Sequence, residues 1–201
     1  MENLNKEYYF TDQAIAQKTR SKKKQIILLN TGCSIDEHLT KITNRYNKKY
    51  TKIPTFTVDK LGQIYQHIDP SNHTQIIDIQ DLNKQSIVIA VENIGWLTHN
   101  EETNQYFDWR GASYSDTVIE KQWRLKKYWA DYTNEQYLGL IELIDYLCIE
   151  YSIDKKIVES NIIINKPNNF NGILTRSNFS KNHYDLTPAF DFEKLIDLTN
   201  N

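Results

Sequence analysis

The chain lacks the features that would place it in a membrane or a disulfide-rich class. Its 201 residues contain one methionine, two cysteines and no apolar run near the ~18 residues needed to cross a bilayer. Cys33 and Cys148 fit no Cys-x-x-Cys pattern, so we expect two unpaired thiols. The N-terminus has neither a basic start nor an apolar core, so no standard signal peptide is predicted.

An excess of basic residues is also missing. Lys and Arg total 24 against 26 Asp and Glu, a formal net charge of −2. The basic runs 20–24 and 48–50 are short and typical of solvated edges. Neither a nucleic-acid partner nor a membrane partner is therefore expected.

Composition and periodicity predict one α/β domain with a central mixed sheet flanked by helices. Apolar residues make up 39% of the chain, and thirteen tyrosines and four tryptophans enrich it in aromatics. Capping boxes at Ser34/Glu37 and Thr133/Gln136 begin two amphipathic helices. We predict helices at 11–19, 35–49, 134–151 and 190–198, strands at 25–30, 86–93 and 161–165, and a hairpin over 55–68 that turns at Gly62.

Residues 95–132 form an aromatic, polar stretch that is predicted to be an insertion with a short helix around 118–129. Its aromatic side chains suit packing of the insertion onto the sheet, a sugar-binding surface or a protein interface. All three interpretations stay open for Tyr106, Phe107, Trp109, Tyr114, Trp123, Tyr128 and Trp129.

Six segments, in this order, resemble the type 2 N-acetylmuramoyl-L-alanine amidases and the peptidoglycan recognition proteins that share their fold. The resemblance implies an N-terminal extension at 1–24 and an amidase-like domain at 25–201 that carries the insertion. The amino-acid sequence of the insertion resembles that of amidase-related proteins of large tailed phages. The segments are QIILLN (25–30), FTVDKLGQIYQHI (56–68), SNHTQ with His73 (71–75), SIVIAVEN (86–93), YTNEQYLGLIELIDYL (132–147) and HYDLTPAFDF (183–192).

The resemblance also implies where a zinc site would lie. The family holds one zinc with three side chains and an activated water that cleaves the amide between muramic acid and L-alanine. The two histidine ligands correspond to Asn30 and Thr175, and the third ligand to Asp185. A proton-transfer glutamate of one subgroup corresponds to Ala90, and a basic residue to His183. Because amide and hydroxyl oxygens bind zinc weakly, we expect no zinc and no hydrolysis.

Other polar residues leave alternatives open. Glu92 either faces the cleft with a raised pKa or is hydrogen-bonded to backbone at the end of its strand. His183 and Asp185 share a face of an extended segment. They form either a surface pair or half of a relocated metal site with His73 or His67.

Three functions follow as hypotheses. The first is a non-catalytic protein that binds peptidoglycan or a related ligand through Asn30, His73, Glu92, Thr175, His183 and Asp185. The second is an active zinc amidase with His183, Asp185 and His73 as ligands. The third is a phage structural or assembly protein whose insertion binds a protein partner. The absence of a signal peptide or a membrane span leads us to expect a cytoplasmic or phage-particle location.

Overall fold

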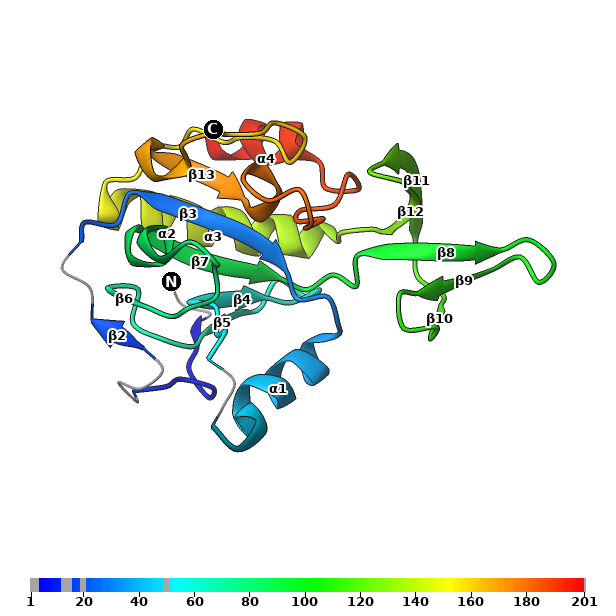
Figure 1. The fold of residues 1–201 in the computed structure, drawn as a ribbon, viewed down its shortest axis with the longest axis horizontal. Helices are drawn as coiled ribbons and strands as arrows, with labels where there is room; N and C mark the ends of the chain where they lie inside the picture. Colours follow the sequence, from blue (N-terminus) through cyan, green and yellow to red (C-terminus); the bar gives the residue numbers. More distant parts are fainter. Residues whose placement is uncertain (1–3, 12–15, 19–20, 49–50, 201) are drawn as a thin grey trace.

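The core of the protein is a six-stranded mixed sheet (Figure 1). The computed structural model describes residues 4–11, 16–18, 21–48 and 51–200. Four neighbouring strands, β4, β7, β3 and β13, run parallel to one another. Strand β5 is antiparallel to β4, and β1 is parallel to β5. In spatial order the strands are β1 (Leu4–Asn5), β5 (Ile64–Gln66), β4 (Phe56–Val58), β7 (Ser86–Val91), β3 (Gln25–Asn30) and β13 (Gly172–Thr175).

Strands β3 and β7 lie at the centre because nearly all their side chains are apolar and both faces of the sheet are covered. Ile26 and Leu28 point to the face covered by α3 (Asn134–Tyr151) and α4 (Phe192–Asn200). Ile27 points to the opposite face, which α2 (Gln80–Gln85) covers. The carboxyl ends of β3, β7 and β13 meet at one edge of the sheet, which we call the carboxyl edge.

Most of the predicted elements are confirmed. Helix α1 (Ile35–Lys48), the hairpin of β4 and β5, strand β7 and helix α3 fall where the sequence placed them. The capping box at Thr133 and Gln136 is present in full. Helix α4 begins at Phe192, two residues later than expected. Within the described residues, no helix is both long and apolar enough to span a membrane.

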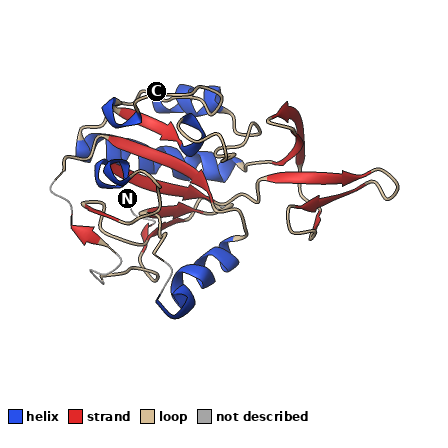
Figure 2. Ribbon diagram, in the orientation of Figure 1, coloured by secondary structure: helices blue, strands red, loops and turns tan. Residues whose placement is uncertain are grey.

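The predicted helix at 118–129 is wrong, because the insertion is a five-stranded antiparallel sheet that projects from the carboxyl edge (Figure 2). Arg124 and Leu125 both have positive φ, at 46° and 66°, and make the two-residue turn between β11 and β12. That tight turn leaves no room for a helix. In spatial order the strands are β10 (Ser113–Tyr114), β9 (Gln105–Asp108), β8 (Trp96–Asn100), β12 (Lys126–Ala130) and β11 (Val118–Trp123).

Two shorter elements were also placed wrongly. Residues 161–165 have no regular secondary structure, because β13 takes the place beside β3 and leaves Ile162 half exposed. Strand β13 lies in the stretch predicted to be irregular, followed by the 3-10 turn η2 (Arg176–Asn178); a further turn, η1 (Pro167–Asn169), precedes it. Of the predicted helix at 11–19, Gln17–Lys18 instead form β2, which pairs with β6 (Asn72–His73); residues 12–15 and 19 lie outside the described residues.

Helix α3 crosses the turn of the β4–β5 hairpin with backbone against backbone. A Cβ added to Gly139 would lie within 2.4 Å of the carbonyl oxygen of Gly62. Alanine is favoured over glycine in a helix by about 1 kcal/mol. We nevertheless expect Gly139→Ala to destabilise the protein by about 2 kcal/mol, because the helix must move off the turn. Urea unfolding measures this, with the exposed neighbour Leu138→Ala as a control expected within about 0.5 kcal/mol of the parent. A stabilised Gly139→Ala protein would contradict the close crossing.

Candidate functional site

The carboxyl edge brings together two of the three positions that correspond to zinc ligands. Asn30 is the last residue of β3, and its backbone N–H donates to Oδ1 of Asp185 at 2.8 Å. Thr175 ends the neighbouring strand β13. All three residues are buried, with at most 8% of each exposed. The fold therefore joins Asn30 and Asp185 directly at this edge and buries all three positions.

Arg176 supplies the charge that balances the buried carboxylate of Asp185. Its Nε donates to Oδ2 of Asp185 at 2.5 Å. Thr175 does not take part, since its hydroxyl and its backbone N–H both bind Oδ1 of Asn178 within the η2 turn. Sequence reasoning missed Arg176. The signal was an arginine next to a position that corresponds to a metal ligand.

The side chain of Asn30 takes part in a separate hydrogen-bond network. Its amide oxygen accepts the hydroxyl of Tyr132 at 2.7 Å. The same hydroxyl accepts the backbone N–H of Thr187 at 3.2 Å, so this network joins β3 to the C-terminal segment. Burial raises the pKa of Tyr132, which keeps the phenol neutral and able to donate.

Ala90 and Glu92 lie on β7 and just beyond it. Ala90 pairs with Leu29, so its side chain faces away from that of Asn30, which pairs with Val91. The carboxylate of Glu92 accepts the backbone N–H of Ile35 and that of Lys60, each at 2.9 Å. Glu92 thus takes the backbone-bonded alternative and holds the first N–H of α1, where a negative charge is stabilising.

Within the described residues, the structure does not group His183 and Asp185 with His73 or His67. His73 lies on β6 next to Lys23, whose ammonium group donates to the carbonyl of Asn72 on β6 and to that of Ser86 at the amino-terminal end of β7. The imidazole of His183 instead shares a 2.6 Å hydrogen bond with Ser180, and burial, followed by the charge of Arg176, lowers its pKa. Across the described residues, no three His, Cys, Asp or Glu side chains are grouped closely enough to hold a metal ion.

The β11–β12 turn of the insertion covers the segment that carries His183. The guanidinium of Arg124 donates to the carbonyls of Ser177 at 3.3 Å and of His183 at 2.5 Å. Tyr184 packs against Trp123 and Trp129, with ring centroids 5.9 Å apart in both pairs. These contacts favour the packing interpretation for Trp123 and Trp129, whereas His99, Tyr106 and Tyr128 cluster within the insertion's own sheet.

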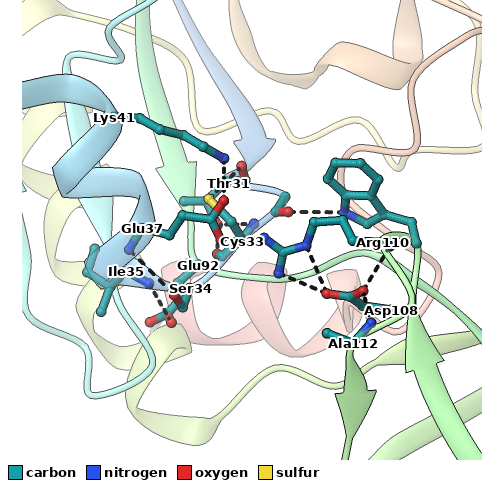
Figure 3. Close-up of polar contacts among 12 residues, drawn as sticks. Thr31, Cys33, Ser34, Ile35, Glu37, Lys41, Glu92, Asp108, Arg110 and Ala112 are labelled. Atoms are coloured by element: carbon teal, nitrogen blue, oxygen red, sulfur yellow. Dashed lines mark hydrogen bonds and ion pairs between the residues drawn. The ribbon is translucent and has the colours of Figure 1, made fainter. Parts of the chain in front are cut away.

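A second part of the insertion is anchored to the start of α1 (Figure 3). Arg110 forms ion pairs with both Asp108 and Glu37. Trp109 donates its indole N–H to the carbonyl of Gly32 at 3.2 Å. A cavity of about 260 Å³ lies between this part of the insertion and the loop that precedes α1, and neither Asn30, Thr175 nor Asp185 lines it.

The two cysteines are both free, as predicted. Cys33 lines this cavity, and Cys148 lies on α3 in the core. Burial raises the pKa of both thiols, that of Cys148 to about 11. Because the thiolate is the reactive form, a raised pKa lowers the nucleophilicity of both thiols at neutral pH.

Two histidines, His38 and His67, belong to a buried hydrogen-bonded network. His67, considered above as a partner in a relocated metal site, is fully buried, and so is nearly all of His38. Nδ1 of His67 faces the carbonyl of Tyr8 at 3.2 Å and must carry a proton there. The hydroxyl of Thr57 therefore donates to Nε2 of His67 at 2.8 Å and accepts from Nε2 of His38 at 3.1 Å. Both imidazoles are neutral in this arrangement.

The buried network of His67, Thr57 and His38 predicts a loss of stability in mild acid. Burial lowers the pKa of His67 to about 4 and that of His38 to about 3. The unfolded chain takes up protons near pH 6.5 while the folded chain does not, so stability is complete above that pH and falls below it. We expect each histidine to cost about 1.4 kcal/mol at pH 5.5 relative to neutral pH.

Urea unfolding at pH 7.5 and pH 5.5 measures this loss. The dependence of stability on pH should be weaker in the His67→Gln variant. It should persist in His99→Gln, because His99 lies on β8 and takes no part in the network of His67, Thr57 and His38. Equal stability of the parent protein at both pH values would contradict the neutral pair.

Comparison with known proteins identifies the class. The N-acetylmuramoyl-L-alanine amidase family, Amidase_2, matches residues 19–180. The chain belongs to this family, and its fold is the family's single-domain mixed α/β fold. No curated protein matches the chain by sequence.

Solved structures show the same fold at low sequence identity. The endolysin amidase LysCS from Clostridium intestinale is 15% identical with a TM-score of 0.61, covering 100% of this chain and 97% of that one. An endolysin of the Thermus scotoductus bacteriophage Ph2119 is 13% identical with a TM-score of 0.53, covering 98% of each chain. The Escherichia coli amidase AmiD, solved with anhydro-N-acetylmuramic acid-L-Ala-D-γ-Glu-L-Lys, is 16% identical with a TM-score of 0.54, covering 91% of this chain and 60% of that one.

Proposed function

We propose that this chain is a non-hydrolytic member of the amidase family that binds peptidoglycan or a muropeptide. The observation that carries the proposal is the ion pair between Arg176 and Asp185. Zinc sites of this kind need imidazole, thiolate or carboxylate donors. The corresponding positions here supply an amide, a hydroxyl and one carboxylate, and these residues do not fit zinc.

The ion pair strengthens this argument beyond the choice of residues. Both oxygens of Asp185 are already used, one by the backbone N–H of Asn30 and the other by Arg176. A metal ion would have to displace a guanidinium from a buried carboxylate. Such a displacement leaves the arginine without its partner, at a cost of several kcal/mol.

The residues that contact the ligand in this proposal differ from those expected from the sequence. Asn30, Thr175, Glu92 and Asp185 are buried and already hydrogen-bonded, so we place the ligand on the surface beside them. The cavity between α1 and the insertion has Lys60 and Arg110 in its lining. Arg110 is held by Asp108 and Glu37, whereas within the described residues Lys60 is ion-paired only with the exposed Asp116. A carboxylate of a stem peptide, the peptide part of the ligand in the AmiD complex, would bind Lys60 in exchange for Asp116.

Retention on purified, insoluble peptidoglycan tests the proposal. We expect the protein to sediment with the polymer and to release no stem peptide from it. Lys60→Gln should weaken retention, whereas Lys18→Gln, on β2 away from this edge, should not. A protein that stays in the supernatant would refute binding, and released stem peptide would refute the non-hydrolytic assignment.

A protein partner is a second candidate function. The insertion sheet projects from the domain (Figure 1). Two of its large apolar side chains are exposed. Leu125 at the tip of one hairpin is 95% exposed, and Trp109 is 49% exposed. Light scattering tests this candidate: self-association that is lost in Leu125→Ser would favour it, and a strict monomer that binds no partner would count against it.

A further inference from the structure

The insertion sheet carries a row of aromatic side chains on one face. Residues that pair directly in antiparallel strands share a face of the sheet. Tyr114 on β10 pairs with Tyr106 on β9, and Tyr106 pairs with His99 on β8. Tyr128 on β12 pairs with Leu97, which lies two residues before His99 and therefore on the same face. The row thus crosses four neighbouring strands of the insertion.

Three of these rings hold one another in place. The ring centroids of His99 and Tyr106 lie 4.6 Å apart, those of Tyr106 and Tyr128 5.3 Å, and those of His99 and Tyr128 5.5 Å. All three side chains are partly exposed, on a sheet that projects from the domain (Figure 1). We call His99, Tyr106 and Tyr128 the aromatic platform. Because its rings are ordered by mutual contact and still reach solvent, a ligand can bind them without rearranging them.

The polar groups of the platform suit a ligand that carries hydroxyl groups. Nε2 of His99 lies 3.0 Å from Oδ1 of Asn104, so in the neutral imidazole Nε2 carries the proton and Nδ1 is an acceptor. A tyrosine hydroxyl both donates and accepts. The charge beside Tyr128 is balanced, because Lys127 forms an ion pair with Glu120. The platform therefore favours an uncharged ligand over a charged one.

A sugar strand has the matching chemistry. A pyranose ring presents a flat face of C–H bonds surrounded by hydroxyl groups, and the negative face of an aromatic ring attracts such C–H bonds. Neighbouring strands lie ~4.8 Å apart, so a row across four strands spans about 14 Å. That span is longer than one sugar ring, so the row can contact several consecutive sugars.

The row is continuous with the cavity assigned to the ligand. Tyr114, at its first strand, lines the cavity of about 260 Å³. Nζ of Lys60 lies 5.9 Å from the centroid of the Tyr114 ring. Stem peptides branch from the sugar strand of peptidoglycan. A strand whose stem peptide reaches Lys60 therefore has its sugars beside the insertion sheet.

We propose that the aromatic platform binds the sugar strand of the polymer, with consecutive sugar rings lying across the row from Tyr114 to Tyr128. The inference deepens the proposed function, on which it rests, and assigns the sugar and peptide parts of the ligand to different residues. The insertion then makes the protein prefer a strand of several sugars over a single one.

Calorimetry with the full chain tests this preference. The probes are the β-1,4-linked tetramer of N-acetylglucosamine, which carries no peptide, and the N-acetylglucosamine monomer. We expect the tetramer to bind at least about tenfold more tightly, because several sugar rings engage the row at once. Equal affinity for the two probes, or no binding of the tetramer, would overturn the proposal.

Variants assign the preference to the platform. Tyr106→Leu combined with Tyr128→Leu keeps apolar bulk but removes two aromatic faces, and should weaken tetramer binding at least about tenfold. Tyr106→Phe combined with Tyr128→Phe keeps the rings and should cost only a few fold. Tyr146→Leu removes a tyrosine of α3 that is 42% exposed, and should leave the affinity unchanged. Full affinity in the double leucine variant would overturn the assignment.

A measurement on the parent protein does not depend on the folding of any variant. Addition of the tetramer should shift the amide NMR signals of β8, β9 and β12. Shifts confined to other elements would overturn the proposal.

The two proposals fail separately. Retention on insoluble peptidoglycan without binding of the tetramer would refute the sugar platform and keep the proposed function. Tetramer binding by a protein that does not sediment with peptidoglycan would refute the proposed function and keep the sugar platform.

Discussion

Replacing Arg176 by methionine is expected to destabilise the protein by about 3–5 kcal/mol, because the substitution leaves the carboxylate of Asp185 buried without a counter-charge. The side chain of Asp185 is 6% exposed and that of Arg176 is 23% exposed, so solvent cannot replace the lost partner easily. Urea unfolding at pH 7.5 measures the change.

A matched set of variants separates the ion pair from general damage. Arg176→Met combined with Asp185→Asn should recover most of the loss, because asparagine is neutral and its oxygen can still accept the N–H of Asn30. Lys41→Met breaks the partly exposed pair with Glu37 and should cost only about 0.3–0.5 kcal/mol. A loss below about 1 kcal/mol for Arg176→Met would show that the pair contributes no more than a surface contact.

The second large effect is expected for Arg124→Ala. Besides Ser177 and His183, the guanidinium donates to the carbonyls of Ser180 at 3.3 Å and Lys181 at 3.2 Å. Removing it leaves partly buried carbonyls without donors, and we expect the segment 177–184 to lose about 2–3 kcal/mol of local stability. Amide hydrogen exchange in that segment should accelerate by more than about tenfold.

Hydrogen exchange in α3 provides the internal reference for this variant. Protection there should stay unchanged, because α3 lies under the sheet and makes none of the Arg124 contacts. Arg124→Lys keeps the charge but not the planar fork, so it should fall between the parent and Arg124→Ala. Unaltered exchange over 177–184 would show that the insertion does not hold this segment closed.

The parts of the fold that could be predicted from sequence are those with strong local signals. Apolar runs placed β3 and β7, and a complete capping box placed α3. Strand β13 was missed because its four residues, GILT, are too short to show a period and gain their partner only from β3. The insertion's sheet was missed because Arg124 and Leu125 are not typical residues for a turn with positive φ.

The site was only partly predictable for the same kind of reason. The resemblance placed Asn30 and Asp185 at one edge, and the structure joins them directly. It could not show that the side chain of Arg176 rather than that of Thr175 reaches the carboxylate of Asp185. The η2 turn decides which of these two adjacent side chains does so, and the sequence did not predict that turn. The segment 177–183 before Asp185 is bonded by Arg124, which is distant in sequence and reaches this segment only through the insertion.

Zinc content tests the central claim most directly. Protein purified without chelators, incubated with one equivalent of zinc and then desalted, should retain less than about 0.1 equivalent, because the carboxyl edge offers one carboxylate that Arg176 already binds. Retention of close to one equivalent that is lost in Asp185→Ala would contradict the account.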